Sequence, residues 1–354
     1  MKKLKVGIIG ATGMVGQKLV EILSDHPWFE VCVLAAGERS QGKTYEEAMK
    51  NKWNSKNELH EKFRSKIIFN SIEDCEKICS MVNFVFCAVN LEEKKTRELE
   101  YKYAKMECPV ISNNSAHRWT DDVPILIPEI NGDHAKIINF QRKRLGTKIG
   151  FISVKPNCSI QCFLPALYPL KKFGIKIVVV STYQSISGAG KTFEQFSEIK
   201  DNIIPFIEGE EEKTELEPLK ILGTLHENRI INTDISIISS CVRVPVSNGH
   251  MATVFVKFNE DVEIDNIIKI WKSFNPINLP SSPKRYIKYF YDNDRPQVKL
   301  DRNLYNGMGI SVGRIKKESN GIRFICISNN TIRGAAGGSV LSAEFLYKEG
   351  YLNG

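Results

Sequence analysis

Apolar positions in the first part of the chain fall into two kinds of pattern, short continuous runs and helical spacing. Residues 4–9 (LKVGII) and 29–36 (FEVCVLAA) are runs of strand length that are apolar apart from Lys5 and Glu30. Between them, residues 14–24 place apolar side chains three or four positions apart, as one face of a helix requires. Strand, glycine-rich turn, helix and strand in this order predict a βαβ unit, and hence a parallel sheet with helices on its faces.

Further elements of the same kind follow. The patterns predict a strand at 82–89, a helix at 92–105, and strands at 109–112 and 151–154. We therefore expect an α/β fold whose first domain, over residues 1–155, is a Rossmann-type doubly wound parallel sheet.

The pattern changes after about residue 148. It predicts a helix at 158–173, a strand at 176–183, a helix from 191, and strands at 234–244 and 251–258 with near-alternating polarity. Near-alternating strands are typical of a mixed sheet, so we expect a second, α+β domain over 156–330. A last helix at 333–351 is long enough to return, so that 331–354 would complete the first domain.

Composition narrows the class of protein. A chain of 354 residues has the length of two domains, and 42% apolar with 25% charged residues is ordinary globular usage. The net charge of +8 is spread along the chain, which favours anionic small molecules over nucleic acid because no basic run interleaves with aromatics. Nine scattered cysteines without a Cys-x-x-Cys pair favour free thiols. With no signal peptide, membrane span or metal-ligand pattern, we expect a cytoplasmic protein without a metal.

The turn after the first run carries a candidate phosphate site. Gly10, Gly13 and Gly16 lie between the predicted strand and helix, where glycine allows positive φ and the helix N-terminus offers free N–H groups. This context predicts a dinucleotide site, against the alternative of a plain tight turn. After the second run, Arg39 and Ser40 favour the 2′-phosphate of NADP, whereas Glu38 favours NAD.

Three further residues form candidate chemistry in the second half. Cys158 lies where a helix is predicted to begin, and a helix N-terminus lowers the pKa of a thiol and supplies N–H groups for an oxyanion. His250 follows a turn, where an imidazole with an ordinary pKa near 6.5 can deprotonate a thiol. Arg243 could bind a carboxylate through two hydrogen bonds. Taken singly, each has an ordinary structural explanation: a buried thiol, a solvated histidine and a surface ion pair.

Taken together, these residues occur within a set of motifs in a fixed order. The chain resembles the aspartate-β-semialdehyde dehydrogenases, in the branch found in archaea and fungi. The resemblance covers nearly the whole length, through GATGMVGQ (10–17), ERSQGKTY (38–45), SNNSAHRW (112–119), VPILIPEIN (123–131), KPNCSIQC (155–162), QSISGAG (184–190), GEEEK (209–213), RVPVSNGH (243–250) and NNTIRGAAGG (329–338).

The resemblance implies a role for each matching residue. Cys158 would be the nucleophile, His250 the general acid/base and Gln184 the residue that orients the intermediate. The substrate-binding residues would be Arg243 for the α-carboxylate, Glu210 for the ammonium group, and Lys213, Arg118 and Asn157 for phosphate. The cofactor-binding residues for NADP(H) would be Gly10, Thr12, Gly13, Met14, Val15, Gly16, Arg39, Ser40, Ser187, Gly188, Gly190, Asn330 and Gly334.

The implied reaction is the reductive dephosphorylation of L-4-aspartyl phosphate to L-aspartate 4-semialdehyde with NADPH, through a thioacyl group on the cysteine. It belongs to the biosynthesis of lysine, threonine and methionine. The resemblance also implies that the second domain is catalytic and forms the dimer interface of a homodimer or homotetramer, with small molecules as the other partners and neither nucleic acid nor membrane.

The sequence departs from the family's usual residues at two positions, and two other enzyme families offer alternative functions. Gly37 stands where relatives tend to carry serine, which removes one hydroxyl for the 2′-phosphate and leaves the strictness of NADP over NAD open. Asn329 stands where aspartate is more usual, so no role for a carboxylate can be carried over to that position. Malonyl-CoA reductase and, more distantly, N-acetylglutamyl-phosphate reductase share the thiol and hydride steps, but their substrates have no free amine for Glu210 to bind. A non-catalytic relative would be expected to lose the thiol or the histidine, and both are present.

Overall fold

The first sheet is parallel and has the strand order β3-β2-β1-β4-β5-β6. The computed structural model describes residues 3–55, 57–275 and 277–352. The strands of this sheet are β1 (Leu4–Ile9), β2 (Phe29–Ala36), β3 (Phe69–Asn70), β4 (Phe84–Cys87), β5 (Val110–Ser112) and β6 (Ile152–Val154). The chain adds β2 and β3 on one side of β1 and then β4, β5 and β6 on its other side, while all strands stay parallel. This order is that of a doubly wound dinucleotide-binding sheet and confirms the predicted fold.

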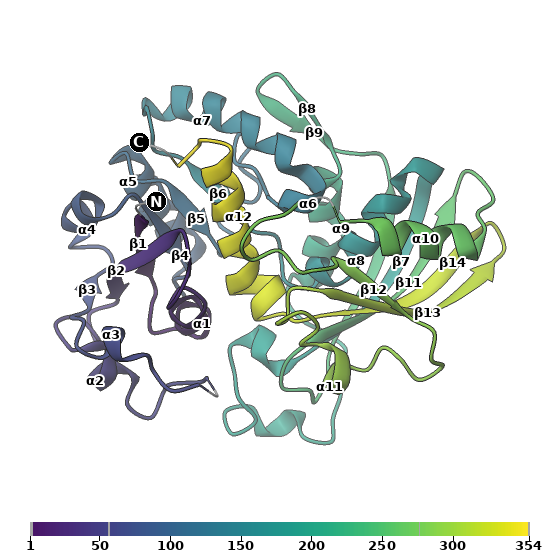
Figure 1. The fold of residues 1–354 in the computed structure, drawn as a ribbon, viewed down its shortest axis with the longest axis horizontal. Helices are drawn as coiled ribbons and strands as arrows, with labels where there is room; N and C mark the ends of the chain where they lie inside the picture. The colour runs from purple at the N-terminus through teal and green to yellow at the C-terminus, as the bar shows by residue number, and fades with distance from the viewer. Residues whose placement is uncertain (1–2, 56, 276, 353–354) are drawn as a thin grey trace.

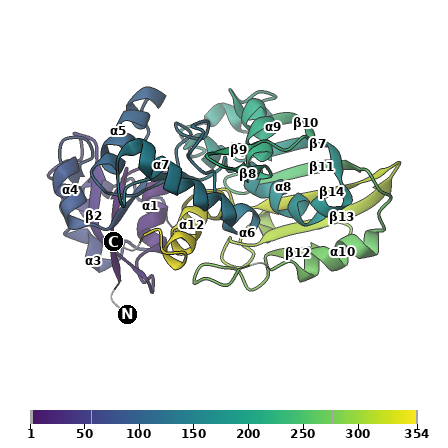
Figure 2. The same cartoon turned by 90° about the horizontal axis from the view of Figure 1, so that it is seen from above.

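Helices lie on both faces of the first sheet (Figures 1 and 2). They are α1 (Met14–Ile22), α2 (Tyr45–Met49), α3 (Glu61–Arg64), α4 (Cys75–Met81), α5 (Glu93–Lys105), α6 (Pro128–Asn131), the 3-10 helix η1 (Gly132–Ile137) and α7 (Ile138–Leu145). Because the sheet is covered on both sides, its strands are continuous apolar runs: the last four residues of β1 and all of β4 are buried. The predicted strands and the helix at 92–105 are confirmed, with ends shifted by one or two residues.

The second sheet is mixed, with the order β10-β7-β11-β14-β13-β12. Its strands are β7 (Ile175–Gln184), β10 (Ser236–Arg243), β11 (His250–Phe258), β12 (Ile287–Phe290), β13 (Ile310–Glu318) and β14 (Gly321–Ser328). β7 and β10 are parallel, whereas β11 is antiparallel to both β7 and β14. Burial alternates residue by residue along β11, because one face of the sheet is covered and the other is partly exposed.

The helices of this part are α8 (Ile160–Leu167), α9 (Glu210–Ile221), α10 (Ile264–Ser273) and α11 (Val298–Asp301), with 3-10 helices η2 (Tyr168–Phe173), η3 (Ile186–Ala189) and η4 (Ser197–Ile199) and a hairpin of β8 (Thr224–His226) and β9 (Arg229–Ile231). Every residue of α8 is buried. In Figure 2, α8 and α10 lie together on one side of the second sheet. α8 therefore forms the centre of this half of the molecule.

The C-terminal segment packs against the first sheet. A π-helical turn, η5 (Ile332–Ala336), leads into α12 (Gly337–Lys348), which lies beside β5 and α1 (Figure 1). Val340, Ala343 and Leu346 of α12 belong to the same buried cluster as α1, β1 and β2. We therefore propose that this segment completes the first domain. The boundaries 1–155, 156–330 and 331–354 stay predictions, and residues 1–2 and 353–354 lie outside the described part.

Three of the predicted helices differ from those in the structure. The helix expected from residue 191 is absent, and the described chain there forms only the short 3-10 helix η4. Residues 191–196 are exposed or half-buried, and the Thr192 N–H donates to the Gln195 side chain, so nothing packs against a helix that is too short to be stable alone.

The second concerns the helix at 158–173. It begins only at Ile160, so Cys158 lies just before it, and it changes to 3-10 geometry at η2, whose first turn contains Pro169. The predicted C-terminal helix likewise starts at Gly337 instead of residue 333, because Ala335 has non-helical angles (φ −140°, ψ −106°).

Candidate active site

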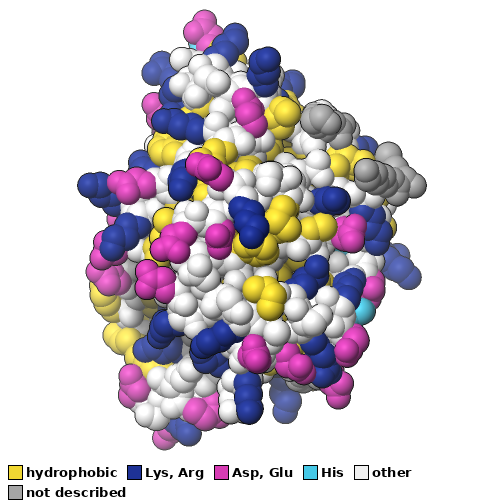
Figure 3. Space-filling view, turned by 90° about the vertical axis from the view of Figure 1, so that its left-hand side faces the viewer, with side chains coloured by type: hydrophobic (Ala, Val, Ile, Leu, Met, Phe, Trp, Pro, Cys, Tyr) yellow, Lys and Arg dark blue, Asp and Glu magenta, His cyan; other side chains and the backbone are white. Residues whose placement is uncertain are grey.

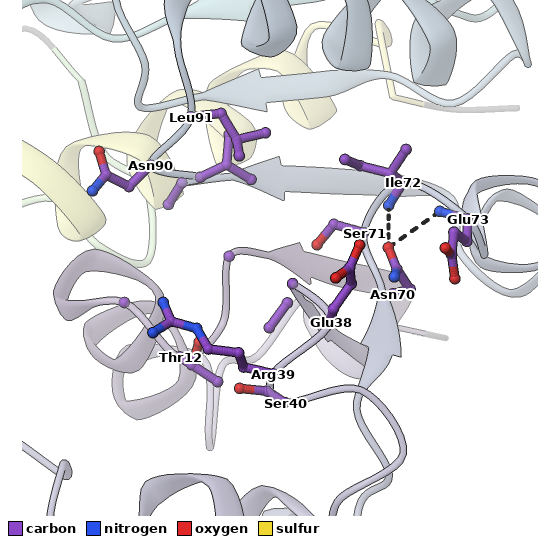
Figure 4. A pocket seen from close by; sticks show the side chains of 16 residues that line it. Thr12, Glu38, Arg39, Ser40, Asn70, Ser71, Ile72, Glu73, Asn90 and Leu91 are labelled. Atoms are coloured by element: carbon purple, nitrogen blue, oxygen red, sulfur yellow. Dashed lines mark hydrogen bonds between the residues drawn. The ribbon is translucent and has the colours of Figure 1, made fainter.

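A cavity of about 520 Å³ opens at the carboxyl ends of β1, β2, β3 and β4 (Figure 4). Gly10 ends β1 with φ +89°, and a Cβ on it would lie 2.3 Å from the carbonyl oxygen of Ala88. Glycine is therefore required for the chain to turn here against the β4 loop. No side chain caps the N-terminus of α1, whose N-cap is Gly13, so the first-turn N–H groups stay available to a phosphate.

The cavity contains five of the predicted cofactor residues. Gly10, Thr12, Gly13, Arg39 and Ser40 line it. Met14, Val15 and Gly16 form the adjoining first turn of α1 without lining it. A Cβ on Gly16 would lie 2.1 Å from the Gly10 carbonyl oxygen, so Gly16 serves the close packing of helix on turn.

Glu38 and Arg39 take different directions from the end of β2. In Figure 4 the Glu38 carboxylate points towards Ser71, whereas the Arg39 side chain extends towards Thr12. Within the described residues, Arg39 has no carboxylate within 4.0 Å. Arg39 is therefore a cation on the cavity wall that has no carboxylate partner in the described part of the chain.

Sequence reasoning missed the far wall of the cavity. It is formed by residues that follow β3 and β4, namely Asn70, Ser71, Ile72, Glu73, Ala88, Val89, Asn90 and Leu91. The signal that could have found them is their position, because ligands of doubly wound sheets bind outside the carboxyl ends of the strands.

A thiol and an imidazole meet where the two sheets adjoin. Cys158, just before α8, has its Sγ 3.3 Å from Nε2 of His250, the first residue of β11. The His250 side chain is fully buried, whereas Cys158 is partly exposed. The pairing joins residues 92 positions apart in the sequence.

The hydrogen bonds of His250 define which nitrogen carries its proton. The backbone N–H of Ser185 donates to Nδ1 over 3.1 Å, so Nδ1 is an acceptor and the neutral ring carries its proton on Nε2, facing the sulfur. Burial, assisted by the charge of Arg243, lowers the pKa of His250 to about 3. The expectation of an imidazole with an ordinary pKa near 6.5 is corrected: His250 is neutral at physiological pH.

The expectation of a lowered pKa for the Cys158 thiol is also wrong. Burial raises its pKa, the Glu210 carboxylate raises it further, and Lys155, Arg118 and Arg243 act in the opposite direction. The net shift is upward because removal from water disfavours the thiolate more than these cations favour it.

One face of α9 provides charges to the site. Glu210, Lys213 and Glu217 are spaced three and four residues apart and so lie on the same side of the helix. Glu210 accepts hydrogen bonds from the side-chain amides of Asn157 (2.8 Å) and Gln184 (3.0 Å) and pairs with Lys213 over 3.1 Å. Burial alone would raise the pKa of Glu210, but Lys213 and the two amides lower it overall, so the carboxylate stays ionised.

Glu217, on the same face of α9, binds the loop that contains Cys158. Glu217, fully buried, accepts from Nη1 of Arg118 and from the backbone N–H of Asn157, both over 2.8 Å. The Arg118 Nε in turn donates to the Lys155 carbonyl. Sequence reasoning missed Glu217 because nothing in the sequence relates it to Arg118, 99 residues away.

Arg243 and Gly188 are fitted closely together. Arg243 ends β10, is buried, and donates from Nη1 to the Ser185 carbonyl over 2.8 Å. A Cβ on Gly188 would lie 2.8 Å from that Nη1 and 3.2 Å from Cε1 of His250. Gly188 therefore leaves the room in which both side chains sit.

Asn330 organises the turn that precedes His250. Its Oδ1 accepts from the Gly249 N–H (2.7 Å) and from the Ser185 hydroxyl (3.2 Å), and its Nδ2 donates to Ser187 (2.9 Å). A Cβ on Gly334 would lie 2.8 Å from Cβ of Cys158. Gly188 and Gly334 thus lie against His250 and Cys158, and Asn330 holds Ser187 and the turn before His250. These four residues do not line the glycine-turn cavity, and a Cβ on Gly190 would have nothing within 4 Å.

Three observations concern metal-ligand groups, membrane-spanning helices and surface charge. It contains no group of three His, Cys, Asp or Glu side chains placed to hold a metal ion. None of its helices combines the length and apolarity needed to cross a membrane. On the face shown in Figure 3, basic and acidic side chains are interspersed, without the one-sign patch that nucleic acid requires.

Known proteins resemble this chain over its full length. The family profile described as "Semialdehyde dehydrogenase, NAD binding domain" matches residues 5–138, and "Semialdehyde dehydrogenase, dimerisation domain" matches 167–333. The aspartate-semialdehyde dehydrogenase of Archaeoglobus fulgidus is 41% identical over 98% of this chain and 99% of its own. That of Aspergillus fumigatus is 35% identical over 99% of each chain, and the malonyl CoA reductase (NADP) of Metallosphaera sedula is 34% identical over 99% of each.

Solved structures agree with this likeness. The crystal structure of aspartate semialdehyde dehydrogenase with NADP from Candida albicans superposes with a TM-score of 0.88 at 30% identity, covering 99% of this chain and 100% of that one. Aspartate semialdehyde dehydrogenase II of Vibrio cholerae complexed with ASA gives 0.76 at 26% identity, with the same coverage.

Proposed function

The chain belongs to the aspartate-semialdehyde dehydrogenase family, and on that premise we propose how its own residues carry out the reaction. The enzyme is an NADP-dependent oxidoreductase that converts L-4-aspartyl phosphate, NADPH and a proton into L-aspartate 4-semialdehyde, phosphate and NADP⁺. The observation that carries the assignment of residues is the 3.3 Å contact between Cys158 Sγ and His250 Nε2, with a buried carboxylate and a buried guanidinium beside it. Cys158 is the nucleophile.

The charges around the sulfur suit an amino acid. Arg243 binds the α-carboxylate, and Glu210, kept ionised, binds the α-ammonium group. An acyl-CoA substrate brings no amine to Glu210 and would leave a buried carboxylate without a counter-charge from the substrate. This argument favours aspartyl phosphate over malonyl-CoA, although a malonyl CoA reductase is among the relatives.

The residues around the glycine turn fit a dinucleotide. The free N–H groups of α1 suit a pyrophosphate, and Arg39 with Ser40 suits a 2′-phosphate. When bound, NADPH supplies the hydride that reduces the acyl group. Ser187, Gly188, Asn330 and Gly334, which lie in the turns next to Cys158 and His250, would hold the nicotinamide end. Gly190 would adjoin them.

The chain's own residues account for the remaining steps. The Cys158 thiolate attacks the acyl carbon, and the oxyanion is stabilised by N–H groups at the head of α8. Phosphate leaves towards Lys213, Arg118 and Asn157, and a thioester remains on Cys158. Gln184 orients this group. Reduction leaves an oxyanion on the former acyl carbon, which accepts a hydrogen bond from the Nε2–H of the neutral His250. Its collapse breaks the C–S bond, releases the aldehyde and returns Cys158 as the thiolate.

We further propose that two copies pair through the outer face of the second sheet. A row of paired residues crosses it from β10 to β14, Ile238, Val179, Phe255 and Arg323. Ile238 is 55% and Val179 40% exposed, a surface that a second copy would cover. Sedimentation of the wild type and of Ile238→Glu tests this interface, since only the wild type should form dimers or tetramers.

A cytoplasmic location is part of the same proposal. All nine cysteines are free thiols, the state that a reducing compartment maintains. Fractionation of cells that express the protein at its native level would test it.

A nicotinamide assay tests the reaction. With aspartate semialdehyde and NADP⁺, we expect NADPH to form only when phosphate is added, and more slowly with NAD⁺. Malonyl-CoA with NADPH should give little turnover. Phosphate-independent oxidation, or a higher kcat/KM for malonyl-CoA, would contradict the proposal.

A further inference from the structure

Tyr45 is the last residue of the motif at 38–45, and the mechanism above gives it no role. It is the first residue of α2 and is fully buried. Its hydroxyl donates a hydrogen bond to the carbonyl oxygen of Ala11, 34 positions earlier, over 2.8 Å. The ring also packs edge-on against Trp53, with ring centroids 6.4 Å apart. A buried tyrosine hydroxyl needs a hydrogen-bond partner, and Tyr45 has its partner in the glycine turn.

The backbone of Ala11 is held at both of its polar groups. Its N–H donates to the Ala35 carbonyl of β2 over 2.9 Å, and its carbonyl oxygen accepts from Tyr45. The peptide bond between Ala11 and Thr12 is trans, so the C=O of the first residue and the N–H of the second point in opposite directions. The hydrogen bond from Tyr45 therefore turns the N–H of Thr12 away from the tyrosine.

Thr12 offers a backbone donor at the cavity wall. It lines the cavity, whereas Ala11 and Tyr45 are buried and do not. Among the described residues, the Thr12 N–H has no hydrogen-bond acceptor. By contrast, the N–H of Gly13 donates to the Gly10 carbonyl over 3.1 Å. An anion in the cavity can thus use the Thr12 N–H without breaking a hydrogen bond of the protein.

The position of Tyr45 is fixed by the structure around it. The loop that contains Arg39 and Ser40 leads into α2, whose N-terminus is closed by a capping box at Thr44. The N–H of Tyr45 donates to the Lys66 carbonyl over 2.8 Å. The tyrosine is therefore held in place by its own backbone and helix, as a residue that positions another group must be.

We propose that Tyr45 is a positioning residue of the cofactor site: through the Ala11 carbonyl, its hydroxyl aims the Thr12 N–H at the pyrophosphate of the bound dinucleotide. The pyrophosphate suits this place because the uncapped N-terminus of α1 adjoins the turn, whereas the 2′-phosphate is assigned to Arg39 and Ser40. Tyr45 does not line the cavity, so it acts through the backbone alone. The inference rests on the proposed binding of NADP(H) at the glycine turn.

Tyr103 provides a matched control on the far wall of the cavity. It is also buried, and its hydroxyl donates over 2.9 Å to the carbonyl of Ser71, which lines the same cavity. The N–H that follows this carbonyl, that of Ile72, already donates to Oδ1 of Asn70 over 2.9 Å. No free donor therefore depends on the Tyr103 hydroxyl, whereas one does depend on the hydroxyl of Tyr45.

Calorimetric titration of the full chain with NADP⁺ and with NAD⁺ tests the proposal. Tyr45→Phe keeps the ring and removes one hydrogen bond, so it should raise the Kd of both dinucleotides by about 3- to 10-fold. The factor should be the same for both, because both contain the pyrophosphate. Tyr103→Phe should change either Kd by less than about 2-fold. In steady-state kinetics, the effect of Tyr45→Phe should appear in KM for NADP⁺, not in kcat or in KM for the semialdehyde.

Hydrogen–deuterium exchange of the wild type needs no variant. Saturating NADP⁺ should slow exchange at the Thr12 amide by about 10-fold or more, measured residue by residue.

Four results would each overturn the proposal: a Thr12 amide that NADP⁺ leaves unprotected, an unchanged Kd in Tyr45→Phe, a rise confined to NADP⁺, or an equal rise in Tyr103→Phe. All four leave the proposed function standing. If the wild type binds neither dinucleotide, the proposed function fails and this inference fails with it.

Discussion

The pKa values of single side chains at the site depend on neighbours from several segments of the chain. Cys158 contacts a histidine from β11, and its pKa responds to the charges of a carboxylate from α9 and a guanidinium from β10. Burial moves the pKa values of the thiol and the imidazole away from their ordinary ranges, upward for Cys158 and downward for His250. Chemistry at this site therefore depends on the surroundings of each group as much as on its type.

Replacement of Cys158 by alanine should abolish turnover without unfolding the protein. We expect kcat to fall by at least about 10³-fold, because no other group can form the thioester. The nicotinamide assay measures the rate, and thermal unfolding checks the fold. Cys32→Ala, which removes another partly buried thiol from β2, should leave the rate unchanged. Ordinary rates in Cys158→Ala would refute the assignment of the nucleophile.

Gly188→Ala should impair catalysis through two displaced neighbours. Its Cβ would lie 2.8 Å from Nη1 of Arg243 and 3.2 Å from Cε1 of His250, so both side chains must shift. We expect a fall in kcat/KM of about 10- to 100-fold, since misplacement by a fraction of an ångström affects the reacting geometry. Steady-state kinetics with aspartate semialdehyde would measure kcat/KM. A variant as active as wild type would show that Arg243 and His250 can accommodate a Cβ at this position without losing their function.

At the scale of elements, α9 links the cysteine loop to the second sheet. The helix presents Glu210, Lys213 and Glu217 on one side, and it packs beside β10. Through Glu217 it holds both Arg118 and the backbone of Asn157. A helix that is polar on its inner face is stable here because nearly all those polar atoms have partners.

Glu217→Gln should destabilise the protein because it leaves the Arg118 guanidinium buried without its counter-charge. Loss of one member of a buried pair costs about 3 kcal/mol or more. Chemical denaturation would measure the free energy of unfolding. Glu212→Gln, on the exposed side of the same helix, should change it by less than about 0.5 kcal/mol. Equal effects of the two substitutions would contradict the prediction.

At the scale of the molecule, one buried cluster spans both sheets, and a second fills the other face of the first sheet. Residues of β1 and β4 share the first cluster with α8 and β11. The two parts of the chain are therefore held together by a common apolar core, and α12 closes the opposite side of the first sheet.

A fully buried histidine, His117, makes the protein sensitive to acid. Burial lowers the pKa of His117 to about 4, below its value near 6.5 in the unfolded chain. Between those values the unfolded state binds more protons, so the free energy of unfolding falls as the pH is lowered. From pH 7 to pH 5 we expect a loss of about 2 kcal/mol from this residue alone.

Denaturation of wild type and His117→Gln at the two pH values checks this expectation. The variant should lose correspondingly less stability on acidification, because glutamine does not titrate. If the two proteins lose the same amount, His117 is protonated in the folded state with an ordinary pKa.

The sequence by itself determined the local features: the glycine turn, the apolar strands, the motif around Cys158 and the family to which they point. These follow from φ requirements, apolar periodicity and short-range spacing, which a linear sequence contains. The sequence did not reveal that the helix expected from residue 191 is absent, or that Arg118 pairs with Glu217. It also left undecided which nitrogen of His250 carries the proton and that the pKa of the Cys158 thiol is raised. Only the tertiary structure decided these, because burial and contacts between residues distant in the sequence set them, and neither quantity exists until the chain has folded.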